Sequence, residues 1–542
     1  MRGVRGRVLA SFVFLGVEAQ AVGAQAGLQP QCAAPEWIEL WSPLAHLADN
    51  QTSLPSLPTC TPRSWWGPVS GLFLTGRNPA ARIGDVRNTS ATFAGSWGRQ
   101  SGAYRRPLDP AATTATRLSA LGWSGQEAGP ILVGRAELEQ ERFDPGTRLD
   151  VYNAGSASPF VLTDTGTFPL RRIRARVEGS GSWSVGRVSV GLGAGYESRS
   201  SRTIEAPFTR SIGGTLAGAT AGVLWSAESW TFGFHARGRR RSEIASLNKA
   251  SAFGLVYDLR GYQDISGSPV LADYSRWTQE FAWSLGTDLS WSGERLSGFV
   301  SGELTRLNLR QWRAELNNPP TDRWVTSGWN LTFGGSWRAS QGLTVFGRTG
   351  FSHLTGTARE AANPTDTSFS AAASLISTSL SLWVRPWTAS GWAGVLTSTL
   401  RKETNRREDL VAQLVTDVST TSWSMELEVA NRFGRSELGV RGGLLNYVPH
   451  ARIPDPEAQS PVYQDLIAGE VGLYSTAAWT WQAAGFLRQW VGPGKAIWAS
   501  IGLERLAPRS TPAPPSTDGS RTAAGIRAGI TLGAGNGPGQ AP

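Results

Sequence analysis

The chain contains four histidines, and their spacing bears on whether the protein could be an enzyme or a metalloprotein. His46, His235, His353 and His450 lie far apart, and none belongs to a zinc motif such as HExxH. Ser352 directly precedes His353, but an isolated Ser-His neighbour pair is common by chance and lacks a third orienting group. We therefore expect no catalytic residues, no cofactor and no metal site, and the chain is predicted not to be an enzyme.

Several charged residues could together bind or steer ions. Within each segment they are separated by even numbers of positions. Even spacing puts side chains on one face of a β-strand. The basic members of this set are Arg172, Arg174, Arg176, Arg237 and Arg239. The acidic members are Glu280, Asp288, Glu426 and Glu428.

The elements that would position these residues are long β-hairpins. From Ile173 to Trp183 the odd positions are apolar or glycine, and after a turn at Ser184–Gly186 the alternation resumes. A soluble sandwich has the same period, but long arms, short turns and aromatic residues at strand ends favour strands that cross a bilayer. The 64 glycines and 24 tryptophans fit many strands with aromatic residues at the membrane interfaces.

Short and long links alternate along the chain from Ser90 onward. Gly434–Arg435 is a short link, whereas Glu243–Ser275 and Asn405–Gln413 are long and polar. Bacterial outer-membrane barrels have short periplasmic turns and long external loops. Counting back from a last strand near residues 520–533 gives 18 strands, within a range of 16–20, one of them starting near residue 463. The sequence thus predicts an all-β fold, an antiparallel transmembrane β-barrel, with Ala252–Tyr262 left in an external loop.

The chain divides into four segments. Residues 1–26 read as a signal peptide, with a basic start, an apolar stretch and a small-residue cleavage site. Residues 27–89 do not alternate and are expected to form a small irregular plug or cap, residues 90–533 the barrel, and residues 534–542 a flexible tail. Cys32 and Cys60 are the only cysteines, and in an exported protein we expect them to form a disulfide, the alternative being two free thiols.

From the signal peptide to the last strand, the chain resembles bacterial outer-membrane β-barrel proteins. Arg77-Asn78-Pro79-Ala80 is also similar to the Asn-Pro-Ala sequence near the first strand of barrels like the long-chain fatty-acid transporter. The last strand departs from the usual pattern, since it continues past Leu532 into a glycine-rich tail rather than ending on an aromatic residue. The resemblance implies a location in the outer membrane of a Gram-negative-type envelope, with the lipid bilayer and lipopolysaccharide as partners.

In such a barrel the charged residues above face the lumen. We expect the arginines to form a basic wall and the carboxylates an acidic wall; the alternative is mutual neutralisation by ion pairs, which would close the lumen. The net charge of +10 is spread along the chain, so nucleic acid is not an expected partner.

The predicted function is an outer-membrane barrel that passes or binds a solute, as a channel or transporter. The sequence has no large separate plug domain or convincing energy-coupling motif, which argues against a TonB-dependent receptor. Two alternatives remain. One is a carrier of hydrophobic compounds like the fatty-acid transporter, and the other is a non-transporting barrel that serves as an anchor or as a partner in a secretion or uptake assembly.

Overall fold

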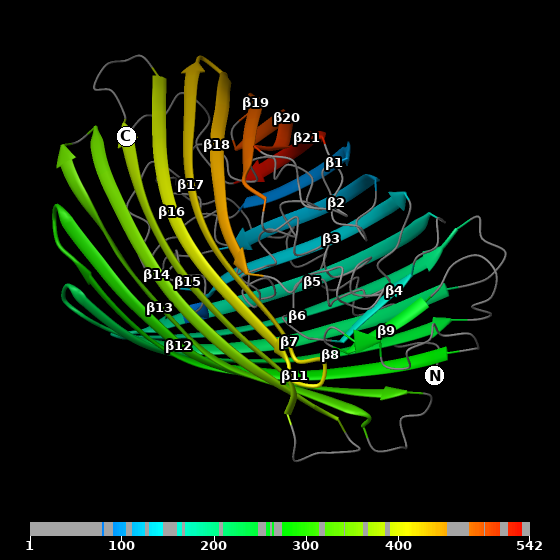
Figure 1. Ribbon diagram of the computed structural model, residues 1–542. Helices are drawn as coiled ribbons and strands as arrows, with labels where there is room; N and C mark the ends of the chain where they lie inside the picture. Colours follow the sequence, from blue (N-terminus) through cyan, green and yellow to red (C-terminus); the bar gives the residue numbers. More distant parts are fainter. Residues whose placement is uncertain are drawn as a thin grey trace, which may run out of the picture.

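The computed structural model describes residues 78–80, 90–103, 111–124, 129–144, 160–164, 169–204, 210–247, 256–260, 263–264, 274–313, 320–340, 342–360, 367–384, 391–452, 476–492, 494–509 and 519–533. Within these residues, 18 antiparallel strands form one ring (Figure 1). Each strand of the ring pairs with the next one along the chain, and β1 closes the ring on β21. The predicted 18-stranded antiparallel barrel is therefore confirmed.

Apart from the link between β16 and β17, the barrel strands have alternating short and long connections, as expected. Their bounds are β1 (Ser90–Gly102), β2 (Ala112–Ser124), β3 (Ile131–Asp144), β5 (Leu170–Val185), β6 (Val188–Thr203), β7 (Arg210–Ala227), β8 (Trp230–Leu247), β11 (Tyr274–Ser292), β12 (Leu296–Arg313), β13 (Asp322–Ser340), β14 (Leu343–Glu360), β15 (Thr367–Val384), β16 (Gly391–Asp409), β17 (Leu414–Phe433), β18 (Ser436–Arg452), β19 (Ala478–Gly492), β20 (Lys495–Pro508) and β21 (Arg521–Gly533). Gly186 and Gly434, each in a tight hairpin turn, have φ of 60°, a conformation that glycine adopts without steric cost.

Three further strands lie outside the ring. They are β4 (Phe160–Asp164), β9 (Val256–Arg260) and β10 (Gln263–Asp264), and they form a small separate sheet in the order β10-β9-β4. The sheet is built from two of the long links, the one after β3 and the one after β8. As predicted, then, the segment around Ala252–Tyr262 contributes no strand to the barrel.

Two details of the sequence prediction are wrong. The strand expected from residue 463 begins at Ala478, which is opposite Tyr447 on β18. The link expected at 405–413 is a tight turn, because β16 continues to Asp409 and a carboxylate oxygen of Asp409 accepts the backbone N–H groups of Val411 and Ala412. The polar run before Asp409 resembles a loop in sequence, yet its alternate residues face the polar lumen.

The two faces of the ring have opposite character. Leu304 is 63% exposed on the outer wall, whereas the adjacent Glu303 is 8% exposed on the inner wall. Exposed tryptophans lie beside the short turns, among them Trp230, whose ring is 6.4 Å from that of Trp291. An apolar outer wall, aromatic residues at its edge and an even strand number are the properties of a bacterial outer-membrane barrel, and this protein is one.

The predicted signal peptide, the cysteines Cys32 and Cys60 and the C-terminal tail lie outside the described residues, as does the predicted plug apart from residues 78–80. In the described part, no helix has the length and apolarity needed to cross a membrane.

Candidate functional site in the barrel lumen

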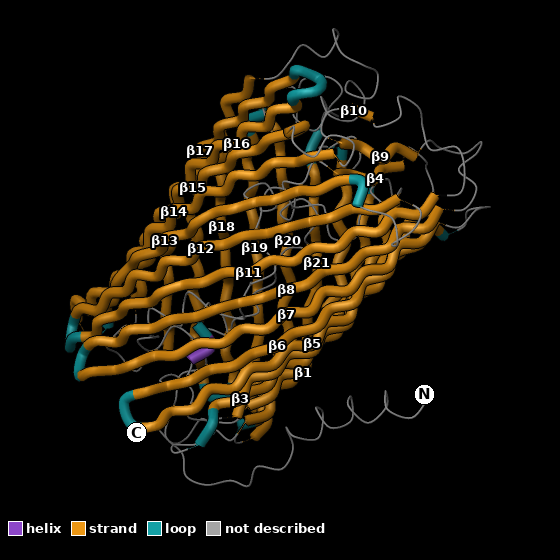
Figure 2. Tube along the Cα trace, turned by 90° about the horizontal axis from the view of Figure 1, so that it is seen from below, coloured by secondary structure: helices purple, strands orange, loops and turns teal. Residues whose placement is uncertain are grey.

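Pro79 and Ala80 form a short helical turn, drawn in purple in Figure 2, and Asn78 directly precedes it. Asn78 is 2% exposed and Ala80 is fully buried. The side-chain oxygen of Asn78 accepts the backbone N–H of Ala80 at 3.0 Å, which closes the turn. Ala80 also packs with the lumen-facing side chains of Leu224 and Phe299. The tripeptide is therefore held against the inner wall.

Three glycines on adjacent strands make room for the tripeptide. A Cβ atom added to Gly191 on β6 would lie 2.3 Å from the backbone nitrogen of Ala80. One added to Gly222 on β7 would lie 2.1 Å from Oδ1 of Asn78, and one on Gly233 of β8 would lie 2.9 Å from Nδ2. Gly191 and Gly222 face each other across the β6–β7 pair. Any larger side chain at Gly191 or Gly222 would overlap the tripeptide.

A buried carboxylate binds the Asn78 side chain. Asn78 Nδ2 donates a hydrogen bond to Oδ2 of Asp288 on β11 at 2.9 Å. The same oxygen is 2.9 Å from Nδ1 of His235 on β8, and the Ser301 hydroxyl donates to Oδ1 at 2.8 Å. A carboxylate only accepts hydrogen bonds, so His235 carries a proton on Nδ1. Asp288 thus joins the tripeptide to three strands of the wall.

The polar network continues beyond His235. Nε2 of His235 lies 4.0 Å from the Glu303 carboxylate on β12, which also accepts the Ser284 hydroxyl and lies 3.8 Å from Nε of Arg237. His235 is therefore hydrogen-bonded to Asp288 through Nδ1, while its Nε2 lies near Glu303 at a distance longer than a hydrogen bond. The Ser301 and Ser284 hydroxyls donate to these two carboxylates, and the described residues contain no group of His, Cys, Asp and Glu side chains suited to a metal ion.

The predicted basic residues of β5 face the lumen together with glutamates. Arg174 lies 3.3 Å from Glu139 on β3 and 3.1 Å from Glu197 on β6. Arg172 lies 3.6 Å from Glu141, and Arg176 pairs with its own-strand neighbour Glu178 at 2.8 Å. Sequence reasoning missed the β3 glutamates, although residues 136–141 read AELEQE and carry the same alternation.

The predicted acidic residues are paired in the same way. Glu280 on β11 lies 2.8 Å from Arg239 on the adjacent strand β8. Glu426 on β17 pairs with Arg441 on β18, and Glu428 is the cross-strand partner of that arginine. Opposite charges thus sit on neighbouring strands, and these predicted lumen residues are joined in ion pairs. The selectivity of a basic and an acidic wall and the closure of the lumen by neutralisation both stay predictions.

The Ser352–His353 pair has no catalytic geometry. The two side chains are adjacent in β14 and so point to opposite faces of the wall. Nδ1 of His353 instead lies 2.7 Å from the hydroxyl of Ser374 on β15, and its ring is next to Trp329.

An apolar cluster occupies another part of the inner wall, toward the long links. Trp324 at its centre is 1% exposed, and its ring is 6.1 Å from that of Phe369. The buried members of the cluster are Ala282, Leu307, Leu309, Trp324, Ala358, Phe369, Ala371 and Leu414.

The chain is similar to one protein family and to several solved barrel structures. The model of a family described as "Family of unknown function (DUF6850)" matches residues 79–532, and none of the curated proteins matches. BauA, the ferric preacinetobactin receptor from Acinetobacter baumannii, is 9% identical, with 82% of this chain and 80% of that chain covered and a TM-score of 0.41. The ferric yersiniabactin uptake receptor FyuA from Yersinia pestis is 11% identical, with 82% and 80% covered and a TM-score of 0.38. The FrpB iron transporter from Neisseria meningitidis is 9% identical, with 84% and 83% covered and a TM-score of 0.40. At such identities the likeness is one of barrel architecture alone.

Proposed function

The chain belongs to the family of unknown function DUF6850, and from its lumen we propose that it is an outer-membrane channel for a small polar solute, narrowed by residues 78–80. We call Asn78, Pro79 and Ala80 the latch. The observation that carries the proposal is the buried hydrogen bond from Asn78 to Asp288, made where glycines clear the wall for the latch. A barrel that served only as an anchor would not need glycines that leave room for residues 78–80 against its inner wall.

The described hydrogen bonds of the Asn78 side chain are individually weak enough to be reversible. Asn78 Nδ2 makes one short bond, to Asp288, and longer ones of 3.3 and 3.5 Å to the carbonyl oxygens of Phe234 and Val223. A hydrogen bond to a charged group contributes about 1.5–3 kcal/mol. A state with the latch released is therefore separated from the closed state by a free energy that solute binding could offset.

The lining favours a polar solute. Ion pairs such as Arg174–Glu139 and Arg239–Glu280 place charged, hydrogen-bonding groups on the lumen side of the wall. Such a lining favours binding of a polar solute over an apolar one.

The direct experiment compares two asparagine variants. Asn78→Ala removes the bond to Asp288, whereas Asn330→Ala removes a lumen-facing asparagine that accepts a hydrogen bond from Thr332. In liposomes that contain the full chain, Asn78→Ala is expected to accelerate sugar-driven swelling over wild type, and Asn330→Ala to match wild type. Equal swelling of the two variants would contradict the proposal, and no swelling in any of the three would favour the non-transporting barrel.

The apolar cluster around Trp324 favours one second candidate, a carrier of hydrophobic compounds. This candidate requires that a fluorescent fatty acid bind the purified protein and that Trp324→Ser weaken the binding. Failure of the fatty acid to bind the wild-type protein would exclude this second candidate function.

A further inference from the structure

Arginines form a row on the outer wall of the barrel. Arg310 on β12 is the direct cross-strand partner of Arg323 on β13, and Arg306 lies two outward positions before Arg310 on β12. All three side chains are exposed, and they share the outward phase of their strands with Leu304 and Trp329. Like charges directly opposite each other destabilise a sheet. The arginine row is therefore expected to bind an anion that is not part of the chain.

The outer wall here offers no carboxylate. Within the described residues of β11 to β14, the outward positions are apolar, aromatic, glycine, hydroxyl, amide, histidine or arginine. The contrast with the lumen is direct, since Arg174 and Arg239 lie within 3.3 Å of glutamates there.

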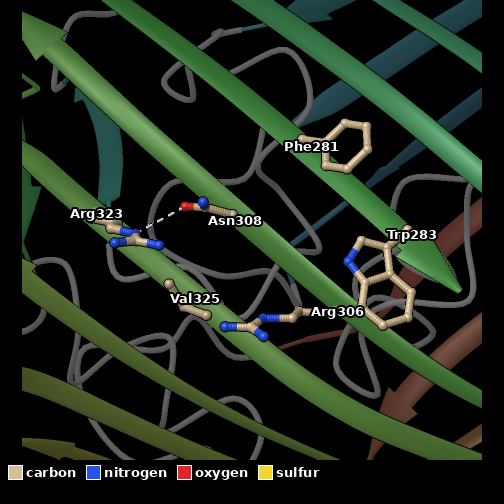
Figure 3. Close-up of a pocket in the computed structure, with 6 residues that line it drawn as sticks. All are labelled: Phe281, Trp283, Arg306, Asn308, Arg323 and Val325. Atoms are coloured by element: carbon tan, nitrogen blue, oxygen red, sulfur yellow. Dashed lines mark hydrogen bonds between the residues drawn. The ribbon is translucent and has the colours of Figure 1, made fainter.

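A groove of about 180 Å³ lies beside the arginine row (Figure 3). Arg323 donates a hydrogen bond from Nε to the side-chain oxygen of Asn308 at 3.1 Å, which orients its guanidinium group beside the groove. Aromatic rings on β11 line the groove together with the cations. The lining residues are Phe281, Trp283, Arg306, Asn308, Arg323 and Val325.

The arginines lie at the depth of lipid headgroups in the external leaflet. A barrel strand crosses the apolar part of a bilayer in about 9–11 residues. On β13 the lipid-facing stretch begins at Trp337 beside the short turn and extends back to about Ser327. Arg323 lies four residues beyond Ser327, toward the end of the strand with the long link. On β12, Arg306 lies ten residues from Leu296 at the short turn, toward the long-link end. Both arginines are thus placed where a phosphate headgroup would be.

We propose that Arg306, Arg310 and Arg323 bind the phosphate groups of a phosphorylated glycolipid of the outer leaflet, of the lipid A type. Guanidinium groups bind phosphate oxygens through paired, charge-assisted hydrogen bonds. The acyl chains lie along Phe281, Trp283 and the apolar wall below. Neutralisation of the arginine row by the lipid then stabilises the β12–β13 pairing.

The test measures lipid binding to the purified full chain by native mass spectrometry. Titrations use bis-phosphorylated lipid A and lipid A from which both phosphates have been removed. An arginine near an anionic membrane surface contributes about fivefold in affinity, so the triple variant Arg306→Gln/Arg310→Gln/Arg323→Gln is expected to bind bis-phosphorylated lipid A on the order of 100-fold more weakly. Arg295→Gln is the matched control, because this exposed arginine lies in the turn of the same hairpin at the opposite membrane edge.

Equal binding of the phosphorylated and dephosphorylated lipids to wild-type protein would overturn the proposal, and this comparison needs no variant to fold. An unchanged affinity in the triple variant, or an equal loss in Arg295→Gln, would overturn it as well. Competition by millimolar inorganic phosphate alone would assign the site to free phosphate instead of a lipid and would also overturn it.

Discussion

Adding one methyl group to the lumen at Gly222 is expected to make the channel more open. In Gly222→Ala the new Cβ would lie 2.1 Å from Oδ1 of Asn78, and real Cβ contacts almost never fall below 3.0 Å. The Asn78 amide therefore has to move by about the difference between these two distances. Its Nδ2 starts 2.9 Å from Asp288, so the displacement stretches that bond beyond hydrogen-bonding range.

The size of the effect follows from the lost bond. A hydrogen bond to a buried carboxylate contributes about 1.5–3 kcal/mol, and each 1.4 kcal/mol is a factor of ten. Gly222→Ala is therefore expected to raise the ratio of open to closed channels roughly 10- to 150-fold. Open probability of single channels in planar bilayers measures this ratio directly.

The matched control is Gly350→Ala on β14. This lumen-facing glycine also gains a methyl group, but its Cβ would meet only Thr332, at an ordinary distance of 3.7 Å. It is expected to leave the open probability at the wild-type value. A fall or no change in Gly222→Ala relative to Gly350→Ala would refute the reasoning, since an added methyl that does not displace the latch can only narrow the pore.

Two other outcomes are expected. Replacing Arg172, Arg174 and Arg176 together with glutamate would place like charges beside the glutamates that these arginines now pair with. The anion-to-cation permeability ratio, measured from reversal potentials, is therefore expected to fall, and the urea concentration at the midpoint of unfolding is expected to fall as well. An unchanged permeability ratio in a conducting variant would reject the placement of these residues in the lumen. Cys32 and Cys60 are expected to be unreactive toward an alkylating reagent until reductant is added, and free thiols in the exported protein would show that the predicted disulfide does not form.

The strands were predictable because a barrel wall has a strict period of two. One side faces lipid and the other faces water, so residues such as Ile173 and Arg174 alternate without interruption. The same polarity caused the errors at the strand ends. Polar residues before Asp409 face the lumen inside a strand, yet in sequence they cannot be distinguished from a loop.

The candidate site was only partly predictable. Alternation placed His235 and Asp288 on the lumen side of their strands, but the two meet only because β8 and β11 pair in one particular register across a long link. The Asn78–Asp288 bond joins residues 210 positions apart, and no local pattern encodes such a contact. The Asn-Pro-Ala resemblance was the only sequence signal that pointed to the latch.

The outer arginine row shows the same limit. Arg310 and Arg323 each look like an ordinary polar residue near the end of a strand. Their direct opposition depends on the register of β12 with β13, which becomes visible only when the strands are paired.

The most direct test of the central claim locks the latch covalently. In a chain with Cys32→Ser and Cys60→Ser, the pair Asn78→Cys and Gly222→Cys places two thiols within reach of a disulfide, because a Cβ on Gly222 lies 2.9 Å from Cγ of Asn78. Single-channel recording before and after addition of reductant is the measurement. The channel is expected to be closed when the disulfide is formed and to open reversibly when it is reduced, with no response to reductant in either single-cysteine variant. Equal conductance of the cross-linked and reduced forms would contradict the account, because the latch would then occupy the lumen without narrowing it.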